Sequence, residues 1–515
     1  MDFHLSKSKF VSNCVHCNKY TWLEKYKPDE KAEVSEFTQS LFDNGHKVGE
    51  LAKEYLNASV DVTAVDENGR LDLAKMLENT DKQIKLGTKA IAEASFSFGG
   101  LFCSVDILVR NDDGSYNIYE VKSSKPEKPT KKNPDGVKEK YKLDAAYQQY
   151  ILKSCGLKVN EVYIVLLNRD YIRSDEFEID KYFTQCNVTN ETTALEPFVK
   201  DKLSEIGGVL SDENEPATVL SKGCNGCDFW KYCSGNIKSP SPFDIYCLRF
   251  DEKCKLYNAG VSFYDVPKYK GGLSEFAKLQ IEYHNRPNDI YINKDKIKNF
   301  LDNLSFPLYS LDFETYQSVF PEYEGMGIGG QVPFQYSLHI IKKANPDISE
   351  GSADIEEHNF LDLSGADTRR AIAESLVKDI PYGANVMAYN ESTERNIIRR
   401  LAESYSDLAD HLLSYNYFDP LKIFREGSYY TAAMGKSCSL KSIAPALYPY
   451  DKDMDYHNLE GNIKNGSQAM NVFFKVREFS EEEKLQTEQD LKKYCALDTF
   501  AVVKIIKKLY EVAGD

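Results

Sequence analysis

Asp106, Glu120 and Lys122 are the residues whose types and spacing first suggest chemistry. Glu120 and Lys122 are two apart in an apolar-rich run, so on a strand they point to the same face. Asp106 interrupts another apolar run, and because Asp is disfavoured in strands its carboxylate needs a partner there. A divalent cation held by both carboxylates could polarise a phosphate and generate a nucleophile for phosphodiester hydrolysis. The same charges would also fit the solvent-exposed face of a hairpin.

A β-hairpin would bring the two acids together. Two apolar-rich runs flank residues 111–115, whose sequence Asn-Asp-Asp-Gly-Ser is a dense turn signal. If these five residues form the loop, Arg110 faces Tyr116 and Asp106 lies directly across from Glu120. Opposed side chains have Cβ atoms about 4.5–5.5 Å apart, a distance at which like charges repel. A bound cation would relieve that repulsion.

This arrangement resembles the PD-(D/E)xK nuclease family, with Asp106 as the metal-binding aspartate and Glu120-Val121-Lys122 as the ExK element. The resemblance implies a restriction-endonuclease-like mixed sheet in which Asp106 and Glu120 hold Mg²⁺ or Mn²⁺ on the scissile phosphate. It also implies that Lys122 positions or activates the attacking water.

RecB-like members of that family carry a metal-binding or active-site histidine on an early helix and a glutamine on the helix after ExK. His46, in an amphipathic pattern over residues 35–56, and Gln148, in a helix predicted over residues 143–156, match these positions. A lone histidine is also often structural. Glu93 is a further acidic candidate, ranked lower because a carboxylate just before the hairpin is usually on the surface.

Cys224, Cys227 and Cys233, spaced C-x2-C-x5-C, are a metal-binding signal. A fourth ligand is expected from the early CxxC, either Cys17 or Cys14, and both zinc and a [4Fe–4S] cluster accept four thiolates. The pattern of one early and three late cysteines resembles the iron–sulfur RecB-like exonucleases, including the nuclease of CRISPR spacer acquisition. That resemblance favours Cys17 over Cys14 and [4Fe–4S] over zinc. Two later cysteines, Cys247 and Cys254, are interpreted as structural.

A second set of acids lies in the C-terminal half. Asp312 and Glu314 share one face of a predicted strand, and Tyr494 and Asp498 are one turn apart on a long helix predicted over residues 481–512. The pattern resembles the DnaQ-like exonucleases of the DEDDy group, which have a ribonuclease-H-like fold. The resemblance implies that the acids hold two metal ions, that Tyr494 orients water and that nucleotides are removed in the 3′→5′ direction.

The remaining acid of that group normally follows an Asn and an aromatic residue. Here Asn390 is followed by Thr393 in the aromatic position and by Glu394 in place of Asp. Glu394 is therefore the expected fourth ligand, its side chain longer by one methylene, while Glu391 is too close to Asn390 to fit. Asp419 is a weaker acidic candidate. In residues 434–447, Lys436 and Lys441 could contact phosphate, although a surface loop is the default interpretation.

The composition limits the possible partners. The chain has 515 residues and a net charge of −16, so the phosphate contacts of a nucleic-acid site would need a local basic patch. Residues 122–142 hold eight lysines against three acids and are the candidate for that patch, with a solvated linker as the alternative. No run approaches the ~18 apolar residues of a membrane span, and the N-terminus has no apolar signal core. A cytoplasmic protein with no membrane partner is expected.

We therefore expect an α/β protein with two mixed sheets flanked by helices. The predicted domains are a RecB-like nuclease domain over residues 1–238, a helical connector over 239–303 and a DnaQ-like domain over 304–515. This order resembles a bacterial family that joins the two domains. The expected function is metal-dependent hydrolysis of nucleic acid, with DNA favoured and RNA possible. The alternatives are a nucleic-acid-binding scaffold with one or both sites inactive and an iron–sulfur redox sensor.

Overall fold

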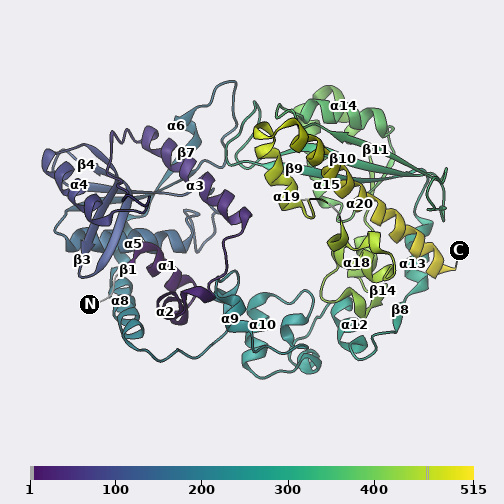
Figure 1. Cartoon of the computed structure of the whole chain (residues 1–515), viewed down its shortest axis with the longest axis horizontal. Helices are drawn as coiled ribbons and strands as arrows, with labels where there is room; N and C mark the ends of the chain where they lie inside the picture. Colours follow the sequence, from purple (N-terminus) through teal and green to yellow (C-terminus); the bar gives the residue numbers. More distant parts are fainter. Residues whose placement is uncertain (1–4, 460, 462, 515) are drawn as a thin grey trace. The chain divides into compact units, whose positions relative to one another are not determined.

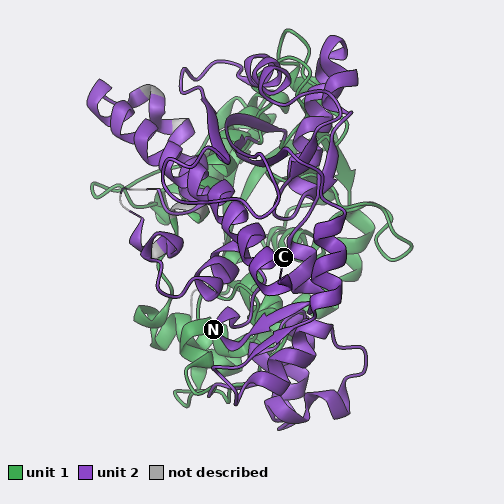
Figure 2. Cartoon of the chain, turned by 90° about the vertical axis from the view of Figure 1, so that its right-hand side faces the viewer, with its two compact units in different colours: residues 1–237, 319–329 green, residues 238–318, 330–515 purple. Residues whose placement is uncertain are grey.

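A computed structural model describes residues 5–459, 461 and 463–514 of the chain. These residues belong to two units, which Figure 2 colours separately. Unit 1 consists of residues 1–237 and 319–329, and unit 2 consists of residues 238–318 and 330–515. Each unit packs helices against a mixed sheet, so the predicted α/β class is confirmed.

Unit 1 is built on a seven-stranded sheet with the order β2-β3-β4-β5-β6-β7, and β1 pairs in parallel with the start of β4. Its strands are β1 (Leu5–Ser6), β2 (Val60–Asp61), β3 (Ala90–Phe98), β4 (Leu101–Arg110), β5 (Tyr116–Val121), β6 (Val159–Leu167) and β7 (Phe183–Asn187). Strands β3, β4 and β5 are antiparallel neighbours, whereas β5 and β6 run parallel. The sheet is therefore mixed, and its central hairpin is β4–β5.

The hairpin has the register that the turn signal predicts. Arg110 pairs with Tyr116 and Ile107 with Tyr119, so the loop comprises residues 111–115 as expected. Gly114 in that loop has a φ of 82°, a conformation that glycine adopts without steric cost. Register and loop length together place Asp106 beside the end of β5.

Helices cover both faces of the unit 1 sheet. They are α1 (Lys7–Val15), α2 (Asn18–Tyr26), α3 (Glu36–Tyr55), α4 (Leu73–Leu86), α5 (Glu139–Ser154), α6 (Ile179–Tyr182), α7 (Thr189–Ala194), α8 (Glu196–Ser211) and α9 (Trp230–Ser234). On one face, Tyr147 of α5 stacks on Phe10 of α1 and packs with Leu108 of β4. On the other, Val48 of α3 packs with Ile107, the neighbour of Leu108. This alternation is the period of two that a strand buried on both faces requires.

Unit 2 contains a five-stranded sheet with the order β11-β10-β9-β12-β13 and a separate pair, β14-β8. The strands are β8 (Ile290–Ile292), β9 (Leu308–Gln317), β10 (Gln331–Ile341), β11 (Ile355–Leu361), β12 (Asn385–Met387), β13 (Asn416–Phe418) and β14 (Tyr429–Thr431). Strand β9 is antiparallel to β10 and parallel to β12. The β9–β10 register shifts between Pro333 and Gln335, where a proline cannot donate a ladder hydrogen bond.

Unit 2 has helices on both sides of this sheet and others that pack away from it. They are α10 (Phe250–Asn258), α11 (Val266–Tyr269), α12 (Glu275–Tyr283), α13 (Lys294–Asp302), α14 (Arg369–Asp379), α15 (Ser392–Ser404), α16 (Ser406–Leu412), α17 (Leu421–Arg425), α18 (Leu440–Leu447), α19 (Gly466–Lys475) and α20 (Glu481–Ala513). Helix α20 runs along β9 and β10 (Figure 1). Ser480 and Glu483 form a capping box at its start, which supplies acceptors to its first amides.

Residues 239–303, predicted as a separate helical connector, belong to unit 2. Phe276 of α12 and Ile297 of α13 are buried in the same hydrophobic cluster as Leu509 of α20. The segment also contributes β8, which pairs with β14. Burial of these apolar side chains, at about 25 cal/mol per Å², holds the segment against the rest of unit 2.

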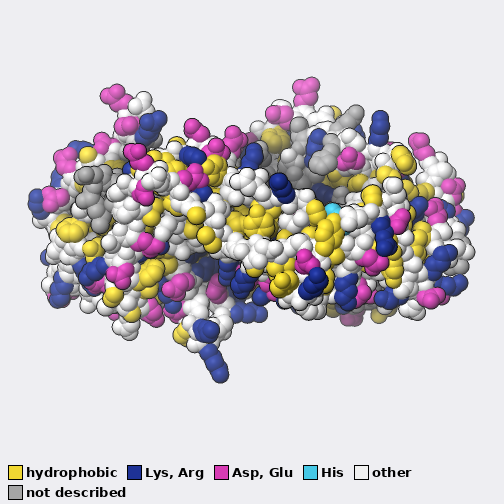
Figure 3. Space-filling model, turned by 90° about the horizontal axis from the view of Figure 1, so that it is seen from below, with side chains coloured by type: hydrophobic (Ala, Val, Ile, Leu, Met, Phe, Trp, Pro, Cys, Tyr) yellow, Lys and Arg dark blue, Asp and Glu magenta, His cyan; other side chains and the backbone are white. Residues whose placement is uncertain are grey.

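Acidic and basic side chains are interspersed over the face drawn in Figure 3. No helix in the described part of the chain combines the length and the apolar character that a membrane crossing requires.

Candidate active sites

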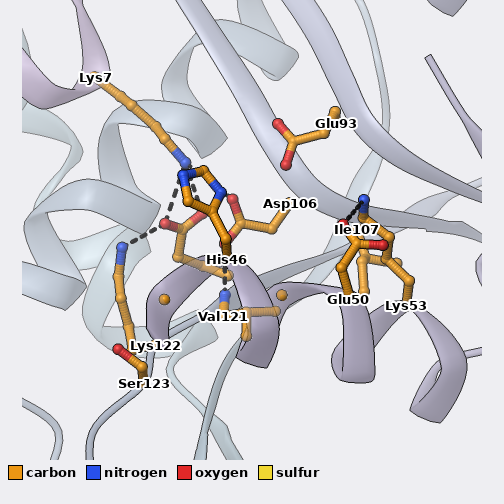
Figure 4. A pocket seen from close by; sticks show the side chains of 13 residues that line it. Lys7, His46, Glu50, Lys53, Glu93, Asp106, Ile107, Val121, Lys122 and Ser123 are labelled. Carbon is orange, nitrogen blue, oxygen red and sulfur yellow. Dashed lines mark hydrogen bonds and ion pairs between the residues drawn. The ribbon is translucent and has the colours of Figure 1, made fainter. Parts of the chain in front are cut away.

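The hairpin of unit 1 brings Asp106 and Glu120 to one lysine. The ammonium of Lys7, at the start of α1, donates to Asp106 Oδ1 at 3.2 Å and to both carboxylate oxygens of Glu120 at 3.1 Å (Figure 4). The second oxygen of Asp106 accepts a hydrogen bond from the amide of Val121 at 2.7 Å. A cation does lie between the two carboxylates, as the charge argument requires, and in this structure the cation is an ammonium group.

Lys122 and Gln148 complete the arrangement on the other side of Glu120. Lys122 Nζ donates to Glu120 Oε1 at 2.5 Å and to Asp144 Oδ2 at 2.8 Å. Gln148 Nε2 donates to Glu120 Oε2 at 2.7 Å and to Asp144 Oδ1 at 3.0 Å. Asp144 and Gln148 are one turn apart on α5 and therefore share a face. Glu120, Lys122 and Gln148, which the sequence predicts as site residues, thus lie together, whereas Asp144 and Lys7 were not predicted.

Glu120 is 1 % exposed, and burial sets its chemistry. Burial and the neighbouring charge of Asp106 raise the pKa of Glu120 to about 8. Burial alone would lower the pKa of Lys122, but the carboxylates of Asp144 and Glu120 outweigh it and hold that pKa above its usual value. Lys122 therefore stays charged beside an acid that takes up protons easily.

A cavity of about 310 Å³ opens beside these groups, lined by Lys7, His46, Glu93, Asp106 and Lys122 among others. His46 reaches it from α3 and is solvent-exposed (Figure 4). The predicted histidine is thus at the cavity wall, next to the acids of the hairpin.

Glu93 lies in this cavity rather than on the surface, which corrects its low ranking. Ala92 pairs with Ile107 and Ala94 with Val105, so Glu93 lies opposite Asp106. Its φ of 57° is left-handed inside a strand, a strained conformation that reorients the side chain and is found at functional sites. Burial and the charge of Asp106 raise the pKa of Glu93 to about 7.

The four predicted cysteine ligands come together in unit 1. Cys17 precedes α2, and the charges of Cys17, Cys224 and Cys233 all act on the thiol of Cys227. Burial raises the pKa of Cys227 to about 11, and Cys17, Cys227 and Cys233 pack around the buried ring of Phe229. Cys14, the alternative early ligand, is instead influenced by Lys202 and Glu205. All the cysteines of the described chain are free thiols.

Gly223 explains how the late cysteines reach the early one. A Cβ atom at this position would lie 2.5 Å from the carbonyl oxygen of Val15 and 2.8 Å from that of His16. His16 Nδ1 is 2.5 Å from the carbonyl oxygen of Gly223. The backbone before Cys224 therefore contacts the α1–α2 junction directly, an approach that only glycine allows.

In unit 2, Asp312 and Glu314 lie on β9 and meet Asp498 and Cys495 of α20. The carboxylate oxygens of Asp312 and Glu314 and the sulfur of Cys495 all lie within 4.8 Å of one another. Burial and the charges of Asp498, Glu394 and Glu314 raise the pKa of Asp312 well above its usual value. Burial and Asp498 raise that of Glu314 to about 8. The charges of the other three predicted acids therefore all act on Asp312.

Glu394 enters this group from α15 and is 4 % exposed. Its Oε2 accepts a hydrogen bond from none of the described residues, and burial raises its pKa to about 8. Asp419 is nearby but accepts from the amides of Asn390 and Leu421 at 3.0 Å. Glu391 forms an ion pair with Lys422 at 3.1 Å. Among the described residues, Glu394 is thus the acid of this region that has a fully buried oxygen without a hydrogen-bond donor.

Two further side chains touch the unit 2 group. Lys441 Nζ donates to the hydroxyl of Tyr494 at 3.0 Å, and Tyr456 donates to Asp498 Oδ1 at 2.5 Å. Lys436, the other lysine considered, pairs with Asp244 at 3.5 Å. Tyr456 and Cys495 were missed by the sequence analysis. Cys495 directly follows Tyr494, which is the one signal that could have drawn attention to it.

The lysine-rich segment over residues 122–142 is irregular until α5 begins at Glu139. Lys138 and Lys140 lie over the ring of Tyr141 at 5.7 and 5.5 Å from its centroid. Lys125 donates to the carbonyl of Ile328 at 3.0 Å. The side chains of Lys128, Lys131 and Lys132 are exposed, so the segment presents positive charge on unit 1.

Comparisons with known proteins leave both sites without a named activity. A family described as a domain of unknown function (DUF2779) matches residues 309–439, a segment that contains Asp312, Glu314 and Glu394 and ends before Tyr494. No curated protein matches the chain. A solved structure described as the crystal structure of SSO0001 is similar, with 13% identity and a TM-score of 0.20. The matched region covers 46% of this chain and 89% of the chain in that structure. A TM-score this low supports no conclusion about the fold.

Replacing Lys7 with alanine is expected to strengthen metal binding in unit 1. The Lys7 ammonium bonds to both carboxylates, so it competes with a metal ion for the same oxygens. Coulomb energies of several kcal/mol at these distances predict a roughly tenfold to hundredfold lower Kd for Mn²⁺. Calorimetric titration with Mn²⁺ would measure this Kd in an Asp312→Asn background. The control is Lys9→Ala, because Lys9 is exposed on the same helix. An unchanged or higher Kd would show that Lys7 does not compete.

Metal binding in unit 2 should strengthen as the pH rises from 6 to 9. Glu314 and Glu394 have pKa values of about 8, so both hold protons at pH 6, whereas carboxylates bind metal only when deprotonated. The measurement is the Mn²⁺ Kd at each pH in an Asp106→Ala background. Glu394→Gln should bind more weakly and with a shallower pH dependence. A Kd independent of pH would contradict this assignment.

Proposed function

We propose that this protein is a metal-dependent nuclease that hydrolyses phosphodiester bonds, with DNA the favoured substrate and RNA possible. The observation that carries the proposal is the same in both units. Buried carboxylates from segments distant in the sequence meet at one place, with a lysine beside them. Buried charges of one sign are costly unless they are compensated, so such groups point to a function that uses them.

In unit 1, Asp106 and Glu120 are the residues that would hold Mg²⁺ or Mn²⁺, with His46 and Glu93 at the same cavity. The metal would polarise the phosphate and generate a hydroxide nucleophile at neutral pH. Lys122, fixed by Glu120 and Asp144, would orient the attacking water, and Gln148 keeps Glu120 in place. These roles are those that the PD-(D/E)xK resemblance implies, and the mixed seven-stranded sheet fits it.

In unit 2, Asp312, Glu314, Glu394 and Asp498 would hold the metal ions of a DEDDy-type 3′→5′ exonuclease. Glu394 Oε2 has no hydrogen-bond donor among the described residues, which fits a ligand role because a buried acceptor without a partner is costly. The contact of Lys441 with the Tyr494 hydroxyl would orient that hydroxyl toward the water it is proposed to position. The mixed sheet, with α20 on one side and α14 and α15 on the other, fits the ribonuclease-H-like resemblance.

The four cysteines of unit 1 suit a [4Fe–4S] cluster better than zinc. Thiolates around one tetrahedral zinc lie roughly 3.8 Å apart, given a Zn–S bond of about 2.3 Å. Among the described residues, these sulfurs do not form a group of three within 4.8 Å of one another. The resemblance to the iron–sulfur RecB-like exonucleases is what favours the cluster, which would join α2 to the segment containing Cys224.

The net charge of −16 is the observation that favours the second candidate, a nucleic-acid-binding scaffold with inactive sites. A nuclease would have to bind phosphate through local positive charge, and the exposed lysines of residues 122–142 are the part of unit 1 that supplies it. The two candidates differ in one outcome, which is whether product forms.

The test is cleavage of end-labelled single- and double-stranded DNA and RNA with Mn²⁺ under anaerobic conditions. Asp106→Ala and Asp312→Ala should each lower the cleavage rate at their own site at least about tenfold, because a metal ligand is lost. The double variant should be inactive. The matched controls are Asp112→Ala, in the exposed hairpin loop, and Asp410→Ala, exposed on α16.

Wild-type protein that binds these substrates but forms no product would favour the scaffold. Activity retained in full by the double variant would also reject the proposal, because the hydrolysis would then come from elsewhere.

A further inference from the structure

Cys495 lies among the acids of unit 2 rather than in a purely apolar core. It is completely buried on α20, three residues before Asp498 and hence on the same helix face. Its sulfur lies 3.8 Å from Asp312 Oδ2 and 3.7 Å from the Asp312 carbonyl oxygen. A thiol in an apolar core would not need to face carboxylates, whereas this one faces two.

The distances fit one shared cation. With Zn–S near 2.3 Å and Zn–O of 2.0–2.2 Å, a sulfur and an oxygen on one tetrahedral ion lie roughly 3.5–3.7 Å apart. The observed Sγ–Oδ2 separation is 3.8 Å, and the ligand atoms of Asp312, Glu314 and Cys495 are mutually within 4.8 Å. The Sγ–Oδ2 separation is therefore within a few tenths of an ångström of the spacing that such an ion requires.

A second, independent observation points to a ligand in the same place. Glu394 is more than nine-tenths buried, and its charge acts on Asp312. Its Oε2 accepts a hydrogen bond from none of the described residues. A buried carboxylate oxygen without a donor is costly, and a cation at Asp312 would satisfy it. The group therefore contains more acceptors than the surrounding protein satisfies.

We propose that Cys495 is a third protein ligand, with Asp312 and Glu314, of one cation in unit 2, and that it makes this site select a thiophilic divalent cation such as Zn²⁺ over Mg²⁺. The inference rests on the proposed function only because it concerns the same group of acids in unit 2. Thiolates favour zinc, whereas sites made of carboxylates alone suit Mg²⁺ and Mn²⁺. On binding, the S–H bond breaks, the sulfur–metal bond forms and the proton passes to bulk water.

The test is metal binding by the full chain, compared between wild type and Cys495→Ser, which keeps the size and replaces sulfur by a hard oxygen. With Co²⁺ as the probe, the wild-type-minus-variant difference spectrum should contain a sulfur-to-cobalt charge-transfer band. Both proteins keep Cys17, Cys224, Cys227 and Cys233, so the contribution of those thiols cancels in the difference. The Zn²⁺ Kd should rise at least tenfold in Cys495→Ser, while the Mg²⁺ Kd changes less than twofold.

Cys254→Ser, a buried cysteine of α10, is the matched control and should show neither change. Absence of the charge-transfer band, or an equal shift in the Zn²⁺ and Mg²⁺ constants, would overturn the proposal. If Cys495→Ser does not fold, Cys495→Ala with circular dichroism as a folding check gives the same comparison. These readouts do not depend on catalysis, so an absence of nuclease activity would reject the proposed function and leave the metal preference to be decided separately.

Discussion

Repulsion between buried carboxylates is the constraint on which both sites depend. Asp106 and Glu120 in unit 1, and Asp312 and Asp498 in unit 2, are held close together where water is largely excluded. In such surroundings, like charges cannot all be ionised without a compensating cation. The raised pKa values of Glu120 and Glu314, each about 8, are the direct consequence. Either protons or cations must be present, and exchange between them is what makes the groups chemically useful.

The two units meet this constraint differently. Unit 1 supplies ammonium groups, since Lys7 and Lys122 both donate to Glu120. In unit 2 hydroxyl groups approach the acids, since Tyr456 donates to Asp498, whereas the Lys441 ammonium donates to the Tyr494 hydroxyl and acts on Glu314 and Asp498 through its charge. Unit 2 therefore depends more on protonation of its acids, and the unsatisfied Glu394 oxygen marks where compensation is incomplete. The same difference makes a sulfur ligand from Cys495 useful in unit 2.

Local signals were enough to predict part of this arrangement. The hairpin register follows from the turn at residues 111–115 and from alternation along the strands, so the position of Asp106 near Glu120 was predictable. The position of Lys7 was not predictable, because it depends on the parallel pairing of the two-residue β1 with β4. That pairing joins segments about a hundred residues apart in the sequence. Glu93 was misjudged because its left-handed φ has no sequence signature. Tyr456 begins a single 3-10 turn, Tyr456–Asn458, that is too short to leave a periodic pattern in the sequence.

The most direct test of the account is anomalous diffraction at the manganese edge from crystals of the full chain grown with Mn²⁺. One peak is expected between Asp106 and Glu120, with the Lys7 ammonium displaced from that position. A second peak is expected among Asp312, Glu314, Glu394 and Asp498. Well-ordered carboxylates without a peak in either unit would contradict this expectation, because these acids would then be compensated by protons and lysines alone.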